Sequence, residues 1–353
     1  MSFAPLNYRV MFLVDVQFDD GSFTTGESWA NFPSWGWRER LATVTEGIAP
    51  LLIGRIFEST SHVHAHLNEA LHGVGRQWGA IGPIQQAISA VDQAFWVRAA
   101  QKEQLSLAAL LSDNPSRTIR AYGSSLGPTN VVADAQRCLE LGLQAAKVKV
   151  GFGAERDTEN LRAIREVVGG SFTLFADANQ AWSLDEALAM VSTLNHFGVT
   201  WLEEPLAGDD PYELAKLTQA SGMPLATGEN LYGASAFGPY LEAGSAHLLQ
   251  PDVGKVGGVT DYLAVSTAAK SQNTLVVPHL YNGAVSTAIT IQVAAADQRT
   301  PWIEWDIRQN EVRDPVSHLL SSDGFVTVPQ GVGLGVDIDF EALNRFQVPT
   351  TLE

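Results

Sequence analysis

Cysteine, basic residues and long apolar runs are all scarce in this sequence. The single cysteine, Cys138, cannot form an internal disulfide bond, and such cysteine usage is typical of a reducing compartment. The chain has 22 lysines and arginines against 39 aspartates and glutamates, which gives a formal net charge of −17. Because nucleic acids and anionic membrane surfaces bind basic faces, this charge argues against both as partners.

Signals for secretion and membrane insertion are also missing. Residues 1–16 lack the basic stretch, apolar core and small-residue cleavage site of a signal peptide. No apolar run reaches the roughly 18 residues that a membrane helix needs. We therefore expect a cytoplasmic protein. An anionic substrate remains compatible with the acidic chain, because a metal ion and a few lysines can make one site locally positive.

The first third of the chain predicts an α+β unit. Residues 8–30 alternate, turn at residues 19–22 and return, which is the pattern of a β-hairpin. Helical patterns follow at 43–54, 61–73 and 83–111. The turn-forming segment 112–117, with its proline, predicts a boundary. We therefore assign a first domain to residues 1–117.

From residue 118 onward, predicted strands alternate with predicted helices. Eight strands over about 190 residues favour a (β/α)8 barrel of the TIM type. No glycine-rich dinucleotide turn follows the first strand, which disfavours an open sheet. We predict a barrel domain at 118–320 and a C-terminal tail at 321–353 that forms a strand pair and returns to the first domain. The predicted strands are 118–124, 145–150, 172–177, 199–203, 224–229, 246–252, 274–279 and 301–306.

Three carboxylates stand at the ends of three successive predicted strands. Asp177, Glu203 and Glu229 are separated by the same interval of 26 residues. Parallel barrel strands deliver their C-terminal ends to one rim, where three carboxylates repel one another unless a cation lies between them. Oxygen-only ligands favour Mg²⁺ ahead of Ca²⁺ or Mn²⁺. Taken singly, Asp177 is equally typical of a helix cap, so the shared spacing carries the prediction of a metal site.

Two lysines lie two positions apart on the second predicted barrel strand. Lys147 and Lys149 point to the same side, which is the barrel interior if Val148 and Val150 face the helices. Solvated lysines on an exposed strand are the alternative interpretation. A neighbouring ammonium group and a divalent cation each lower the pKa of a lysine. Lys149 is therefore predicted to have a lowered pKa and to serve as a general base.

The same strand-end position is filled by Asp252, His279 and Glu304 in the sixth, seventh and eighth predicted strands. An aspartate one βα unit before a histidine can accept the imidazole N–H, fix its tautomer and raise its basicity. A single histidine after a strand is otherwise more often structural. Strands two and seven place Lys149 and His279 on opposite sides of the barrel.

With these residues, almost the full length of the chain resembles the mandelate racemase subgroup of the enolase superfamily. The resemblance lies in the motifs K-x-K, D-A-N, E-E-P, G-E-N, Q-P-D, P-H and a late I-E. It implies a modified (β/α)7β barrel with an α+β capping domain that the C-terminal tail completes. It further implies Mg²⁺ on Asp177, Glu203 and Glu229, a base at Lys149, an acid–base dyad of His279 and Asp252, substrate-carboxylate contacts from Lys147 and Glu304, and Asn179 lining the site.

The resemblance also implies a chemistry. Mg²⁺ would act as a Lewis acid on a substrate carboxylate while a base removes the neighbouring proton to give an enediolate. Segments such as KVKVGFG resemble acid-sugar dehydratases and sugar-lactone cycloisomerases more than mandelate racemase itself. We expect dehydration of an acid sugar to a 2-keto-3-deoxy acid by a homo-oligomer. Racemisation or epimerisation and lactone cycloisomerisation are alternatives, and a Schiff-base aldolase or a non-catalytic binding protein are more distant ones.

Two segments of the first domain are rich in glycine and tryptophan. Residues 27–37 and 72–82 are predicted to be loops that close over the barrel mouth and set specificity. Arg76 in the second segment is a candidate ligand for a distal carboxylate or hydroxyl group. The alternative is that both segments are surface loops with packed tryptophans.

Overall fold

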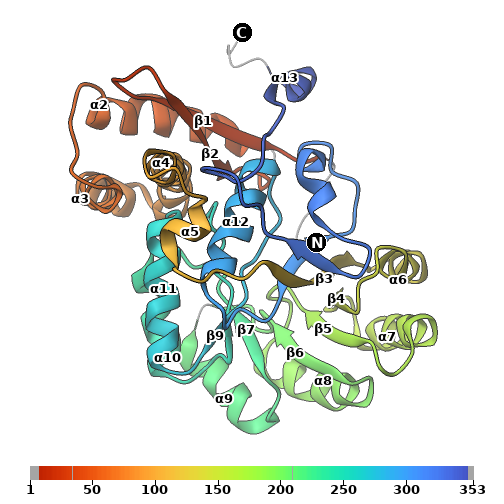
Figure 1. The fold of residues 1–353 in the computed structure, drawn as a ribbon. Helices are drawn as coiled ribbons and strands as arrows, with labels where there is room; N and C mark the ends of the chain where they lie inside the picture. Colours follow the sequence, from red (N-terminus) through yellow and green to blue (C-terminus); the bar gives the residue numbers. More distant parts are fainter. Residues whose placement is uncertain (1–7, 34, 209, 349–353) are drawn as a thin grey trace.

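The computed structural model describes residues 8–33, 35–208 and 210–348 (Figure 1). The outer ends of the first and last predicted domains, 1–7 and 349–353, lie outside the described residues, as does Ser34 of segment 27–37. Among the described helices, none is both long and apolar enough to cross a membrane.

The N-terminal unit is the predicted hairpin with helices packed against it. Strands β1 (Met11–Gln17) and β2 (Phe23–Trp29) pair antiparallel. A left-handed backbone at Gln104 follows the fourth α-helix, and Ser106 caps the next one, so the pattern predicted at 83–111 is two helices. The helices are α1 (Gly36–Ala42), the π-helix η1 (Thr43–Ile48), α2 (Ala49–Leu52), α3 (Thr60–Trp78), α4 (Ile81–Lys102) and α5 (Leu107–Leu111).

The remainder of the described chain contains a barrel of eight parallel strands, and the predicted fold class is confirmed. The hydrogen-bonded order runs from β10 through β3 to β9, so consecutive strands are neighbours. Seven βα units precede the last strand, which is the (β/α)7β arrangement. The strands are β3 (Thr118–Leu126), β4 (Ala145–Lys149), β5 (Thr173–Asp177), β6 (Val199–Glu203), β7 (Leu225–Thr227), β8 (Leu248–Leu249), β9 (Leu275–Val276) and β10 (Ile303–Asp306).

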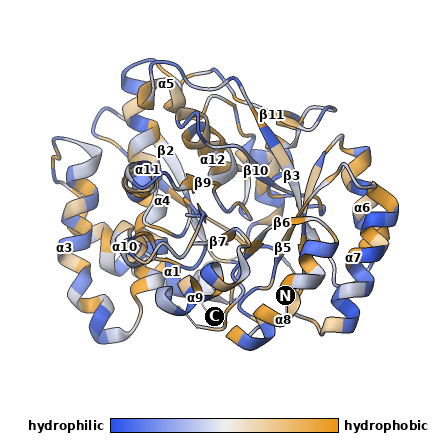
Figure 2. Ribbon diagram, turned by 90° about the horizontal axis from the view of Figure 1, so that it is seen from below, coloured by the Kyte–Doolittle hydropathy of each residue, from blue (hydrophilic) through white to orange (hydrophobic). Residues whose placement is uncertain are grey.

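The helices between these strands form the outer layer of the barrel (Figure 1). Figure 2 shows that α6, α7 and α8 carry both hydrophobic and hydrophilic residues, as expected for helices with one face on a sheet and one in water. The helices are α6 (Val131–Glu140), α7 (Ala154–Val168), α8 (Leu184–His196), α9 (Pro211–Ser221), the 3-10 helix η2 (Ala234–Phe237), α10 (Gly238–Glu242), α11 (Val259–Ser271) and α12 (Ala284–Ala296).

The inside of the barrel below the rim is filled by its own apolar cluster. Phe175 and Trp201 stack with ring centroids 3.4 Å apart, and Tyr122 meets both rings edge-on. Ala145, Ala226, Leu248 and Val277 complete this cluster. Because side chains alternate along each strand, the next inward position above this layer is where polar groups gather.

The C-terminal tail differs from its prediction. Instead of a strand pair, the described part of the tail, residues 321–348, contains one strand, β11 (Phe325–Thr327), which pairs antiparallel with β3 of the barrel. The chain then reaches the N-terminal unit, where Gly333 exchanges backbone hydrogen bonds with Leu105 and Leu107, both at 2.9 Å. The tail therefore contacts both units. The other elements of the tail are α13 (Phe340–Leu343) and the 3-10 helix η4 (Asn344–Phe346). The 3-10 helix η3 (Asp314–Leu319) lies before the tail, between β10 and β11.

We expect the stability of the fold to depend on pH through the carboxyl group of Glu27, which lies where the N-terminal unit contacts the barrel. Burial, with a smaller contribution from Asp252, raises the pKa of Glu27 from 4.5 to about 7, although backbone N–H groups of Ser286 and Gly283 oppose this. A raised folded pKa gives stability that is present below pH 4.5 and lost as the pH rises through about 7. We expect the free energy of unfolding to fall by roughly 3 kcal/mol more in the wild type than in Glu27→Gln across this window. Chemical denaturation at several pH values measures this, and parallel pH profiles would contradict it.

Candidate active site

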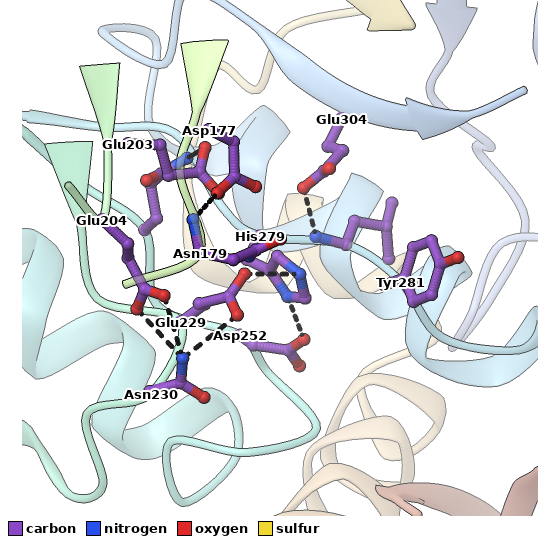
Figure 3. A network of polar contacts seen from close by, with 12 residues as sticks. Asp177, Asn179, Glu203, Glu204, Glu229, Asn230, Asp252, His279, Tyr281 and Glu304 are labelled. Carbon is purple, nitrogen blue, oxygen red and sulfur yellow. Dashed lines mark hydrogen bonds and ion pairs between the residues drawn. The ribbon is translucent and has the colours of Figure 1, made fainter. Parts of the chain in front are cut away.

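The carboxylates of three adjacent strands gather at one rim of the barrel (Figure 3). Asp177 ends β5 and lies opposite Glu203, which ends β6, in the parallel ladder. Glu229 follows β7 two residues later. All three side chains are buried, and Asp177 and Glu203 are 0% exposed. The equal sequence spacing thus corresponds to neighbouring positions in space.

Each of these carboxylates contacts a basic side chain. Glu203 accepts a hydrogen bond from Lys147 Nζ at 2.6 Å, and Lys149 donates to Asp177. Glu229 Oε2 lies 3.0 Å from His279 Nε2. As these side chains stand, no group of three acidic, histidine or cysteine residues in the described chain is arranged to hold a metal ion.

The chemistry of the donor set nevertheless fits a hard divalent cation. Asp177, Glu203 and Glu229 supply only oxygen atoms, and they would exchange their ammonium and imidazole partners for the ion. Burial, together with the charges of Asp177 and Glu304, raises the pKa of Glu203 to about 8, although Lys147 lowers it. Such crowding of buried negative charge is what a bound cation relieves.

The two lysines point into the barrel, while Val148 and Val150 are buried in the outer core between sheet and helices. Lys147 is 1% exposed and reaches Glu304 Oε1 at 3.1 Å as well as Glu203. Lys149, closer to the mouth, also donates to Asn179 Oδ1 at 2.8 Å. Asn179 itself is held by its backbone N–H, which donates to Asp177 Oδ1 at 2.8 Å.

The pKa of Lys149 was predicted to be lowered. This prediction is wrong when only the protein's own groups, without a metal ion, act on the lysine. Burial lowers the pKa of Lys149 and Lys147 lowers it further, but the carboxylates of Asp177, Glu229 and Glu203 together outweigh both, and the net shift is upward. The sequence-based argument counted the second ammonium group and a divalent cation, and left out the attraction of the Asp177 carboxylate, which ends the neighbouring strand β5. A divalent cation on Asp177 would reduce that attraction.

His279 lies between two carboxylates. Its Nδ1 is 2.6 Å from Asp252 Oδ2, and its Nε2 faces Glu229. Burial lowers the pKa of His279, but Glu229, Glu304 and Asp252 raise it well above 6.5. Asp252 is oriented in turn by the backbone N–H of Gly254 at 2.7 Å. The imidazole is therefore held in one orientation and favours its protonated form.

Glu304 is the second residue of strand β10. Its Oε2 accepts a hydrogen bond from the backbone N–H of Leu280 at 3.0 Å, and its Oε1 faces Lys147. It joins the His279 segment to the last barrel strand. Glu304 is 2% exposed, so it belongs to the floor of the site.

Sequence reasoning missed a second layer around these residues. Glu204 accepts hydrogen bonds from Asn230 Nδ2 and Gln180 Nε2, both at 3.0 Å, and burial with Glu229 raises its pKa to about 8. Lys255 donates to Asn230 Oδ1 at 2.8 Å and lies over the Trp29 ring at 4.8 Å. The second glutamate of E-E-P was a signal for Glu204, and the Q-P-D motif three residues before Lys255 was the nearest signal for that lysine.

The two glycine- and tryptophan-rich segments reach the mouth differently from the prediction. In the first, Trp29 belongs to β2 and its ring lies 5.8 Å from that of His279. The second is mostly the last turns of α3, which ends in a left-handed Gly79, and Gly82 packs against the Tyr232 ring. Arg76 is exposed on α3, and within the described chain its side chain makes no hydrogen bond or ion pair with the lysines, His279 or the carboxylates of the site.

Comparisons with known proteins agree with this architecture. Residues 130–343 match the family described as Enolase C-terminal domain-like, and residues 1–112 match the Mandelate racemase / muconate lactonizing enzyme, N-terminal domain. A D-galactarolactone cycloisomerase of Agrobacterium fabrum is 31% identical, over 97% of this chain and 92% of that protein.

Solved structures are similar over the same extent. A mandelate racemase/muconate lactonizing enzyme from Bordetella bronchiseptica superimposes with a TM-score of 0.91 at 35% identity, covering 96% of this chain and 94% of that one. An L-talarate dehydratase from Polaromonas, in complex with Mg and L-glucarate, has a TM-score of 0.80 at 30% identity and covers 94% of this chain and 90% of that one.

Proposed function

Because this chain belongs to the enolase superfamily, in the mandelate racemase and muconate lactonizing enzyme group, we propose that it dehydrates an acid sugar in a Mg²⁺-dependent reaction. The observation that carries the proposal is the pair of basic groups at one carboxylate cluster. Lys149 contacts Asp177 from strand β4, and His279 contacts Glu229 from beyond β9. A small carboxylate placed between them has a proton donor or acceptor on either face.

The binding groups follow from the same cluster. Asp177, Glu203 and Glu229 would hold Mg²⁺, which supplies Lewis-acid polarisation of the substrate carboxylate when bound. Lys147 would donate a hydrogen bond to that carboxylate as its negative charge grows. Glu304 keeps Lys147 in place and is the second group at this end of the substrate. The L-talarate dehydratase, whose structure contains Mg and L-glucarate, supports this assignment.

The reaction needs one base and one acid. Lys149, as the neutral amine, takes the proton from the carbon next to the carboxylate. His279, as the imidazolium held by Asp252, gives its proton to the β-hydroxyl, and the C–O bond breaks to release water. The resulting enol becomes a 2-keto-3-deoxy acid when a proton returns to carbon. The raised pKa of His279 is consistent with an acid in this role.

Lactone cycloisomerisation is the second candidate. It is favoured by the 31% identity with a D-galactarolactone cycloisomerase. The same base would remove the same proton, but the group that leaves the β-carbon is the ring oxygen of a lactone, so no water is lost. A racemase would return a proton to the same carbon from the opposite face.

One screen separates these reactions. Acid sugars and their lactones are incubated with the protein and Mg²⁺ in deuterated water, and keto acid and deuterium at C2 are measured. Keto acid from open acids supports dehydration, keto acid from lactones alone supports cycloisomerisation, and deuterium without keto acid supports racemisation. Borohydride trapping of a substrate on Lys149 would support an aldolase instead. Absence of every one of these signals across the screen would overturn the proposal.

We further expect a homo-oligomer in solution. The expectation rests on the family resemblance, and exposed apolar side chains such as Ile56 (94% exposed), Ile53 and Trp78 offer surface that association would cover. Analytical ultracentrifugation at micromolar concentration should give a mass above that of the 38.0 kDa chain. A single 38.0 kDa species would contradict it.

A further inference from the structure

We propose that Glu27, a carboxylate of the N-terminal unit, is a positioning residue for the His279–Asp252 pair. Its role is to fix the segment that carries His279 relative to the segment that carries Asp252. The inference rests on the proposed function in that it assigns a kinetic consequence to this contact. Glu27 itself touches neither His279 nor a proposed metal ligand by any hydrogen bond within the described chain.

The first observation is the contact between Glu27 and the start of α12. Glu27 is 1% exposed, and its Oε1 accepts a hydrogen bond from the Gly283 N–H at 2.6 Å. Its Oε2 accepts one from the Ser286 N–H at 2.8 Å. Two free N–H groups at a helix start are thus satisfied by a side chain from another domain, only a few residues after His279.

The β-hairpin and the segment that begins α12 are in close van der Waals contact at Gly283. A Cβ atom added to Gly283 would lie 2.3 Å from Met11 Sδ and 3.0 Å from Glu27 Oε1. The backbone angle at Gly283 is ordinary, so glycine is needed for space rather than for conformation. The β-hairpin of the N-terminal unit therefore packs directly against the segment that follows His279.

The second observation links the same strand to Asp252. Gln93 of α4 accepts a hydrogen bond from the Glu27 N–H at 2.9 Å and donates both to Glu27 O and to Val253 O, at 2.9 and 3.0 Å. The Trp29 N–H donates to Gly254 O at 3.0 Å. The residues directly after Asp252 are thus tied to the strand that carries Glu27.

The segment that carries His279 and the segment that carries Asp252 are also hydrogen-bonded to each other near Glu27. Asn282 Nδ2, next to the contact with Glu27, donates to Asp252 Oδ1 at 3.0 Å. Strand β2 with Gln93 therefore holds both sides of the His279–Asp252 hydrogen bond. A carboxylate is needed, because both of its oxygens face N–H donors, whereas an amide presents its NH₂ group to one of them.

The chain provides a matched control in Asp92. This second cap carboxylate is also 1% exposed, and its Oδ2 accepts a hydrogen bond from the Thr260 N–H at 2.9 Å, at the start of α11. Asp92 and Glu27 thus make the same kind of contact from the cap to a barrel helix. Only the Glu27 contact lies on the segment that bears His279.

The test compares Glu27→Gln with Asp92→Asn in the Mg²⁺-loaded full-length protein at pH 8. Hydrogen exchange followed by mass spectrometry should show faster exchange at 279–288 in Glu27→Gln only, and at 258–264 in Asp92→Asn only. With a substrate from the screen, Glu27→Gln should lower kcat about 10- to 100-fold with little change in KM, the range known for outer partners that orient metal-ligating side chains. Asp92→Asn should keep kcat within a few-fold.

Several outcomes would overturn the proposal. These are equal exchange at 279–288 in both variants, equal kcat in both, or a loss in Glu27→Gln that falls on KM alone. If Glu27→Gln does not fold, Glu27→Asp keeps the charge with a shorter reach and is held to the same criteria. The exchange measurement needs no substrate. It can therefore test whether Glu27 fixes the segment 279–288 even if the proposed dehydration is wrong.

Discussion

Glu203→Gln is expected to lower turnover by at least ~10³-fold while the barrel stays folded. Glu203 is the middle of the three proposed Mg²⁺ ligands, and losing several kcal/mol of electrostatic stabilisation corresponds to that factor. Folding should survive because burial already disfavours the charged form of Glu203, whose pKa is raised to about 8. A neutral amide of the same shape removes that cost, although Lys147 loses its counter-charge.

Activity and metal binding are measured together in this experiment. Turnover is followed while Mg²⁺ is titrated into protein treated with a chelator, and circular dichroism reports the fold. Glu204→Gln is the matched control, since Glu204 is the next residue, is also buried and contacts Asn230 rather than serving as a proposed ligand. Its loss should stay within the ~10- to 100-fold typical of groups that support metal ligands. Full activity in excess chelator, or in Glu203→Gln, would refute the metal site.

The residues of the candidate site that lie at strand ends were predictable, because strands recur at regular intervals along the sequence of a (β/α) barrel. In a parallel barrel every strand points its last residues at one rim, so a short apolar run that ends in a charged residue is informative by itself. That rule located Asp177, Glu203, Asp252, His279 and Glu304, and alternation along β4 located the lysines. None of these inferences needed a contact between distant parts of the chain.

The pairings inside the site were not predictable, because they depend on contacts between residues far apart in sequence. Which carboxylate meets Lys149 decides the direction of its pKa shift, and spacing is silent about it. Glu27 lies in segment 27–37 and Lys255 lies three residues after the Q-P-D motif, but neither residue was singled out, because the role of each depends on contacts with distant parts of the chain. Segment 72–82 was interpreted as a loop because glycine disfavours helices, yet Gly75 lies in α3 where its lack of a side chain admits Ile84.

Variants that lack one of the two proposed proton-transfer groups should both lose turnover but should differ in proton exchange. Lys149→Ala and His279→Ala are each expected to lower turnover by at least ~10²-fold, the usual contribution of a general acid or base. Lys149 reaches the site from β4 beside Asn179, whereas His279 reaches it from beyond β9 against Asp252. Because the two groups come from opposite sides of the barrel, each variant should retain one of them.

Isotope exchange distinguishes the two variants where turnover does not. In deuterated water, His279→Ala should still exchange the α-proton of the substrate through Lys149, without releasing keto acid, because the acid for the β-hydroxyl is gone. Lys149→Ala should lose that exchange, or retain only what His279 supports from the other face. Arg76→Ala, on the exposed surface of α3, separately tests the predicted contact with a distal substrate group. If His279→Ala keeps wild-type turnover on the true substrate, the two-face mechanism is wrong and Lys149 works alone.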